Sequence, residues 1–147
     1  MTPFKSLARA VSVLALVSAP AFAQSPAREP IGTSSPTLTP AIRVGNMVYG
    51  SGQLGVSRTA PDSTIQGQTR VALDNIKRVF EQAGTTMDLA VKCTVFLVDL
   101  ADFQGMNQSY REFWPSAPPA RSTVVVSALV VAGAKVEIEC SAAMPSK

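Results

Sequence analysis

The stretch QTRVALDNIKRVFEQAGTTMDLAVKCTVFLVDL, residues 68–100, decides the fold because its hydrophobic period changes midway. Up to Gly84 the apolar residues recur at the spacing of one helical face, which predicts an amphipathic helix with that glycine as its C-terminal cap. From Val91 to Val98 the residues are β-branched and apolar, which predicts a buried strand. A helix beside a buried strand is typical of an α/β domain. The apolar face of the helix consists of Ala72, Ile76, Val79, Phe80 and Ala83.

Secondary structure is expected on both sides of this stretch. The segments AIRV and MVYGSG flank Gly45-Asn46, a turn pair that closes β-hairpins. On the C-terminal side a second helix is expected to begin at Asp99 and to stop at Pro115. The apolar residues along one face of this helix are Phe103, Met106, Tyr110 and Phe113. Two more strands are expected over Ser122 to Leu129 and Lys135 to Ser141.

The predicted order is hairpin, helix, strand, helix, strand, strand. Because strand-helix-strand connections are right-handed, both helices should pack on the same face of one mixed sheet. The segment STVVVSALVV, residues 122–131, is apolar on both of its alternating faces, as in a strand buried on both sides. No third helix is expected that could cover the second face of the sheet. A further copy of the chain is the simplest cover, so the sequence predicts an oligomer.

The N-terminus has the features of a secretory signal peptide. Lys5 and Arg9 precede the apolar run 10–19, and Ala21-Phe22-Ala23 offers the small residues of a cleavage site. The run is shorter than the ~20 residues that span a bilayer, which argues against a membrane anchor. We therefore expect residues 1–23 to be removed after Ala23, giving a periplasmic or secreted protein.

The mature chain is expected to hold a flexible arm and one domain. Residues 24–40 are rich in proline, serine and threonine, a composition that favours a flexible or loosely docked arm. The domain is expected over residues 41–147. The signal peptide carries two of the thirteen basic residues and none of the ten acidic ones, so the mature net charge is 11 − 10 = +1.

Composition excludes several classes of function. The small net charge and the absence of a Lys or Arg cluster argue against nucleic-acid binding. Histidine is absent and the two cysteines, Cys93 and Cys140, stand far apart, which excludes zinc sites of familiar spacing and histidine-dependent nucleophilic catalysis. We expect no metal site of this kind, and no membrane contact after cleavage.

Residues 117–142 contain the charged groups that are candidates for a site. Arg121 follows Pro118-Pro119, which stiffen its approach, and a fixed guanidinium suits a carboxylate bidentately. Glu137 and Glu139 alternate with apolar residues on the last strand and share one of its faces. A plain amphipathic strand with a rim arginine paired to either glutamate explains the same pattern. Spacing alone leaves both interpretations open.

Four segments resemble, in order and spacing, the RidA (YjgF) family of enamine/imine deaminases. They are SGQ at 51–53, VKCTVFLVDLADF at 91–103, PPARST at 118–123 and VEIE at 136–139, and the resemblance extends from Ala41 to Ala142. It implies a chorismate-mutase-like α/β fold assembled as a homotrimer, with active clefts between subunits. It also implies hydrolysis of reactive 2-imino and 2-enamino acids to 2-keto acids and ammonia, without a cofactor.

The resemblance assigns roles to particular residues. Arg121 corresponds to the arginine that binds the substrate carboxylate, and Glu137 to the glutamate that orients water. The backbone carbonyl of Thr123 is implied to help hold that water. Other positions implied to line the cleft are Ser51, Gly52 and Asn107. Without the resemblance, Ser51 would be interpreted as a turn residue and Asn107 as a helix-surface amide.

Departures from the family pattern leave some questions open. Thr39-Pro40-Ala41 lacks the aromatic residue that many relatives carry after Gly-Pro, so the substrate is not fixed. The alternative function is a non-catalytic periplasmic module that binds a small carboxylate in the same cleft. A ribonuclease or translation-inhibitor role fits poorly with export and a net charge of +1. The resemblance places Cys93 and Cys140 on neighbouring antiparallel strands, where a disulfide is possible, but cross-strand strain favours two free thiols.

Overall fold

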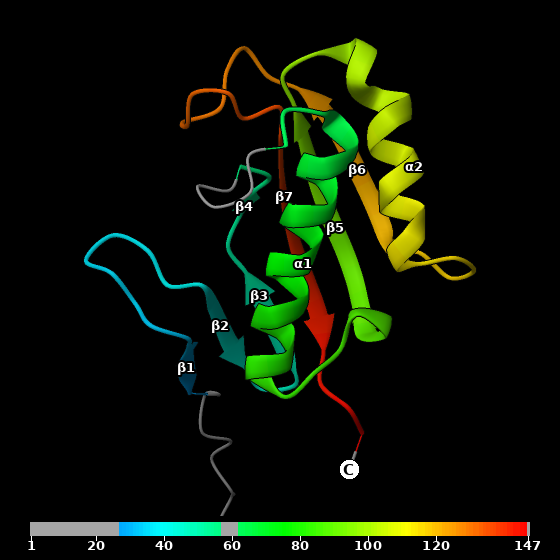
Figure 1. The fold of residues 1–147 in the computed structure, drawn as a ribbon. Coiled ribbons are helices and arrows are strands. Elements are labelled where there is room, and N and C mark those ends of the chain that lie inside the picture. The colour runs from blue at the N-terminus through cyan, green and yellow to red at the C-terminus, as the bar shows by residue number, and fades with distance from the viewer. Residues whose placement is uncertain (1–26, 57–61, 147) are drawn as a thin grey trace, which may run out of the picture.

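The computed structural model describes residues 27–56 and 62–146, and within them forms a mixed sheet with two α-helices on one face (Figure 1). The strand order is β1-β2-β3-β7-β5-β6, with the short β4 also pairing with β7. β5 and β6 are parallel and the other pairs are antiparallel, as the expected connections require. The strands are β1 (Arg28–Ile31), β2 (Ala41–Val44), β3 (Met47–Gly50), β4 (Gln53–Leu54), β5 (Ala90–Leu97), β6 (Ala120–Val125) and β7 (Val136–Ala143), and the helices are α1 (Ile65–Ala83) and α2 (Phe103–Phe113).

The helix that the sequence predicted is α1, and it begins and ends at residues suited to capping. Thr64 accepts a hydrogen bond from the backbone N–H of Gly67, and Gly84 has a φ of 81°, which glycine adopts without strain. The apolar face of α1 packs on the sheet, where Phe80 and Leu73 are fully buried with Val95 of β5. The core therefore lies between the helices and one face of the sheet.

The N-terminal arm differs from the expectation, because part of it is a strand. Residues 28–31 pair antiparallel with β2, so their backbone groups gain hydrogen-bond partners on β2. The composition of the arm does not predict this pairing. Pro30 is tolerated because β1 is an edge strand, where one side of the backbone needs no partner. The proposed signal peptide, residues 1–23, lies outside the described residues. Among the described residues no helix has the length and apolarity to cross a membrane.

Two further elements differ from the expected boundaries. The segment from Asp99 starts as a 3-10 turn over Leu100–Asp102, and α2 itself begins at Phe103. β6 ends at Val125 and not at Leu129, because its partner β5 ends at Leu97 and the N–H of Val126 donates to the Leu97 carbonyl in the final contact.

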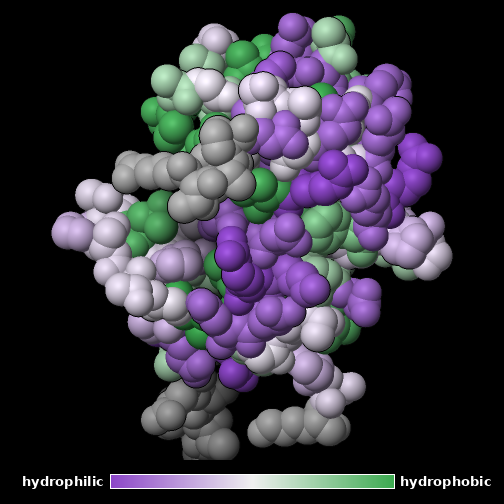
Figure 2. All heavy atoms as spheres, in the orientation of Figure 1, coloured by the Kyte–Doolittle hydropathy of each residue, from purple (hydrophilic) through white to green (hydrophobic). Residues whose placement is uncertain are grey.

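The segment that follows β6 exposes apolar side chains. Val130 is 91% exposed and Val131 is 40% exposed. In Figure 2 the surface over the helices is largely hydrophilic, whereas green side chains gather at the upper left, over this loop. The sequence correctly indicated an apolar segment, but within one chain nothing among the described residues covers it.

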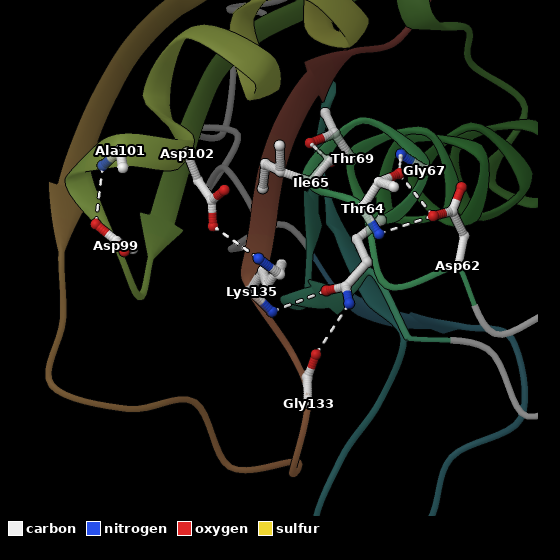
Figure 3. A network of polar contacts seen from close by, with 11 residues as sticks. Asp62, Thr64, Ile65, Gly67, Thr69, Asp99, Ala101, Asp102, Gly133 and Lys135 are labelled. Carbon is white, nitrogen blue, oxygen red and sulfur yellow. Dashed lines mark hydrogen bonds and ion pairs between the residues drawn. The ribbon is translucent and has the colours of Figure 1, made fainter.

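Polar contacts fix the start of β7 against the helices. The Gln68 side chain is 2% exposed; its amide nitrogen donates to the Gly133 carbonyl at 2.9 Å, and its amide oxygen accepts from the Lys135 N–H at 2.8 Å. Lys135 also reaches Asp102 with Nζ 3.4 Å from Oδ2 (Figure 3). These contacts anchor the chain two residues before Glu137.

The structure joins Cys93 of β5 and Cys140 of β7 in a disulfide, so the expectation of two free thiols is wrong. The two residues are directly paired in the antiparallel ladder and are 0% and 3% exposed. The bond therefore connects two neighbouring inner strands of the sheet inside the core.

Reduction of this disulfide should destabilise the protein. The bond closes a loop with a sequence separation of 47, and cross-links of that size typically contribute about 2–4 kcal/mol by restricting the unfolded chain. Urea unfolding with and without a phosphine reductant measures the difference, and a Cys93→Ala, Cys140→Ala variant should no longer respond to the reductant. Two thiols titrated in unfolded, unreduced protein would contradict the bond.

Candidate active site

Arg121 lies in a groove between the edge strand β6 and the helix α2. The segment before β6 contributes Pro118 and Pro119, which restrict the backbone that delivers the arginine. The groove has a volume of about 390 Å³ and is lined by Asn107, Tyr110, Arg111, Trp114, Pro118, Pro119 and Arg121. Arg121 and Asn107, both predicted as site residues, are therefore brought together.

The Arg121 guanidinium has no acidic partner among the described residues. Its Cζ atom lies 4.7 Å from the centre of the Tyr110 ring, and its Nη1 lies 3.9 Å from Sδ of Met106, a weak acceptor. No ion pair joins it to Glu137 or Glu139 in the described part of the chain, so the rim-arginine interpretation is wrong for the single chain. A partly buried cation with free N–H groups beside an open groove is suited to bind an anion.

Glu137 lies elsewhere, on β7, against the segment that follows β3. A Cβ atom at Gly52 would overlap Oε1 of Glu137, so a larger residue there would displace the end of that side chain. The hydroxyl of Ser51 donates to the Thr39 carbonyl at 2.6 Å, which holds this segment against the loop before β2. Gly52 and Glu137 are therefore neighbours, while the Ser51 side chain is engaged in a local contact, as a turn residue would be.

Arg121 and Glu137 point to opposite faces of the sheet. Arg121 pairs with Cys93, whose side chain is buried beneath the helices. Glu137 pairs with Phe96, which alternates with the buried Leu97 and so lies on the open face. One chain therefore holds two separate half-sites, the arginine half-site around Arg121 and the glutamate half-site around Glu137.

Thr123 lies on β6 two residues after Arg121, but it is not among the residues that line the groove. It pairs with Val95, which is buried, and it therefore shares the helix-covered face with Arg121. Its hydroxyl is buried and has no hydrogen-bond partner among the described residues. Glu139, two residues after Glu137, shares the open face but is more exposed.

Tyr110 is a site residue that the sequence did not single out. Its place on the apolar face of the second helix predicted that it would be buried in the core, and it is only 4% exposed. Burial raises the pKa of Tyr110 to about 12, with the Arg121 charge acting in the opposite direction. The phenol is therefore neutral at physiological pH, and no spacing rule would have placed it under Arg121.

The chemistry available at the two half-sites is anion binding at one and proton exchange with water at the other. In the described ranges no three His, Cys, Asp or Glu side chains gather as a metal site. A carboxylate-binding arginine and a carboxylate fit hydrolysis of a small, already electrophilic acid, provided that both can reach it.

Comparison with known proteins agrees with the fold and the motifs. The family described as Endoribonuclease L-PSP matches residues 32–144. The chain is 41% identical over 116 residues to a 2-iminobutanoate/2-iminopropanoate deaminase of Dermatophagoides farinae, covering 77% of this chain and 87% of that protein. It is 38% identical over 107 residues to Reactive Intermediate Deaminase A, chloroplastic, of Arabidopsis thaliana, covering 71% of this chain and 57% of that protein.

A solved structure shows the same architecture. The YjgF gene product from E. coli is 34% identical and superposes with a TM-score of 0.72, covering 78% of this chain and 98% of that one. The chorismate-mutase-like arrangement expected from the sequence is therefore confirmed. The chain belongs to the Endoribonuclease L-PSP family, which is the RidA (YjgF) family that its sequence motifs resemble.

Proposed function

We propose that the protein hydrolyses reactive 2-imino and 2-enamino acids to 2-keto acids and ammonia. The observation that carries the proposal is Arg121, whose guanidinium lies over the Tyr110 ring in a groove and has no acidic partner among the described residues. Relatives named as a 2-iminobutanoate/2-iminopropanoate deaminase and as a reactive intermediate deaminase support it.

The proposed reaction needs no strong nucleophile. The imine carbon is electrophilic, especially when its nitrogen is protonated, so the protein has only to fix the carboxylate and aim a water. Arg121 binds the carboxylate, and Glu137 accepts a proton as the water oxygen bonds to C2. The C=N bond becomes single as a carbinolamine forms, and Glu137 returns its proton to the nitrogen. The C–N bond then breaks as the hydroxyl proton passes to Glu137, so that ammonia leaves and the carbonyl of the 2-keto acid remains; Glu137 finally releases to solvent the proton that the protonated imine brought. The family resemblance assigns the Thr123 carbonyl to holding the water, and Asn107 lines the groove of Arg121, where its amide can contact the substrate.

Two chains are required for this reaction, because Arg121 and Glu137 face opposite sides of one sheet. We propose a homotrimer in which the arginine half-site of one chain meets the glutamate half-site of the next. Within the described residues β6 has an unpaired edge, and Val124 and Val125 are 44% and 52% exposed, which favours a covering neighbour. RidA-type trimers supply the arrangement by analogy.

The function is tested by competition for the imine. An L-amino-acid oxidase with catalase generates 2-iminobutanoate in the presence of semicarbazide, which traps the imine as a semicarbazone. The purified protein should suppress semicarbazone formation in proportion to its concentration and raise 2-oxobutanoate. Binding of 2-oxobutanoate without any such suppression would instead indicate a carboxylate-binding module.

We also propose that the protein is exported. The disulfide between Cys93 and Cys140 supports an oxidising compartment, because such bonds are rare in the cytosol. Protein recovered from the host should begin at Gln24, which N-terminal sequencing or intact mass measures. An intact Met1 on protein from the cell envelope would contradict export.

A further inference from the structure

Tyr110 lies beneath the arginine that the proposed function uses. The ring comes from the middle of α2, and Cζ of Arg121 lies over it at 4.7 Å from its centre. A guanidinium over an aromatic face is held by the negative potential of the ring, and this attraction grows when the pair is sheltered from water. Arg121 is partly buried and Tyr110 is 4% exposed, so the pair is sheltered.

The hydroxyl group does not explain the tyrosine. It is buried and has no hydrogen-bond partner among the described residues, and such a group normally destabilises a protein. Burial raises its pKa to about 12, so the phenol is neutral near pH 7 and carries no charge that would bind the guanidinium. What remains is the ring, which also packs against Trp114 with 4.8 Å between the two ring centroids.

Other contacts of the Arg121 guanidinium are weak. Its only hydrogen bond in the described part of the chain goes to Sδ of Met106 at 3.9 Å, and no oxygen accepts from it. The ring face therefore sets where the guanidinium lies while leaving N–H groups available for a ligand. An aspartate or glutamate in the place of Tyr110 would hold the arginine too, but would neutralise it and occupy the same N–H groups.

We propose that Tyr110 is a positioning residue whose aromatic face holds the Arg121 guanidinium in place without neutralising it, leaving its N–H groups for the substrate carboxylate. The inference rests on the proposed role of Arg121 in binding a carboxylate. It assigns to Tyr110 an electrostatic task in addition to packing, and this task depends on the ring and not on the hydroxyl.

The first test compares three variants by their affinity for 2-oxobutanoate, measured by calorimetry. Tyr110→Phe keeps the ring and should bind as the wild type does, with unfolding at the same or a higher urea concentration. Tyr110→Leu loses the ring face and should bind about tenfold more weakly. Phe113→Leu is the matched control, because Phe113 also contacts Trp114 from α2 but lies outside the groove of Arg121, and its affinity should be unchanged.

The second test separates electrostatics from packing and does not depend on the leucine variant folding. Position 110 is replaced in turn by phenylalanine, 4-fluorophenylalanine and pentafluorophenylalanine. The three rings have similar shapes, but the negative electrostatic potential of the ring face is progressively removed along the series. Affinity for 2-oxobutanoate should fall with each step, to about tenfold overall. Equal affinity across the series, or loss in Tyr110→Phe equal to that in Tyr110→Leu, would overturn the inference.

The outcome is distinguishable from failure of the proposed function. A wild type that binds 2-oxobutanoate but hydrolyses no imine would reject the proposed function, and the fluorinated series would still test Tyr110. A wild type that hydrolyses imine, with affinity that is insensitive to fluorination, would leave the proposed function intact and reject the positioning role alone.

Discussion

Replacement of Arg121 by alanine should abolish imine hydrolysis while the protein stays folded. The change removes the cation that fixes the substrate carboxylate, and loss of one member of a sheltered, hydrogen-bonded charge pair lowers kcat/KM by about 100-fold or more. Stability should fall by no more than about 2 kcal/mol, because Arg121 makes no ion pair within the described residues and the change removes only its contact with the Tyr110 ring. The semicarbazide competition and urea unfolding measure the two effects.

Two further arginine variants show whether the geometry matters or only the charge. Arg121→Lys should restore little activity, because a lysine is a point charge without the planar fork. Arg111→Ala removes an exposed cation from the rim of the same groove and should lose much less activity than Arg121→Ala. Equal losses in Arg121→Ala and Arg111→Ala would mean that the groove attracts anions only by its general charge.

Glu137→Gln should lower turnover by about 100-fold, because glutamine keeps the volume but cannot accept a proton from water. Affinity for 2-oxobutanoate should be largely retained, since Arg121 binds the carboxylate. Single-turnover assays and calorimetry measure these quantities.

Glu139→Gln is the matched control for this prediction. Glu139 lies on the same strand and the same face, one pleat further along, but next to Thr94 and not at Gly52. It should lose much less activity than Glu137→Gln. Small and equal effects of the two changes would mean that Glu137 has no catalytic role and that β7 is an ordinary amphipathic strand.

The parts of the fold that were predictable are those with local causes. Gly84 ends α1 because it adopts a positive φ, and Gly45 adopts a φ of 59° in the turn that closes the β2–β3 hairpin. β1 was not predictable, because its proline-containing sequence becomes a strand only through pairing with β2. The end of β6 likewise depends on where its partner β5 ends.

The candidate site was predictable in its residues but not in its arrangement. Sequence alternation placed Glu137 and Glu139 on one face, and the structure agrees. Whether Arg121 lies on the helix-covered face of the sheet or on its open face depends on the register between β5 and β6. No local sequence pattern encodes that register. The same limitation applies to Tyr110, whose apolar spacing indicated burial but not a contact with Arg121.

The central claim is that each active site joins the arginine half-site of one chain to the glutamate half-site of the next. The most direct test combines two inactive variants, Arg121→Ala and Glu137→Gln, in the same trimers. The two variants are co-expressed with different affinity tags. Activity is then measured both in the total pool and in the protein that carries both tags. Random trimers should regain about a quarter of wild-type activity, because three quarters of them are mixed and each mixed trimer contains one intact site out of three. Activity no greater than that of the parent variants, in a pool shown by the tags to contain mixed trimers, would contradict a site shared between chains.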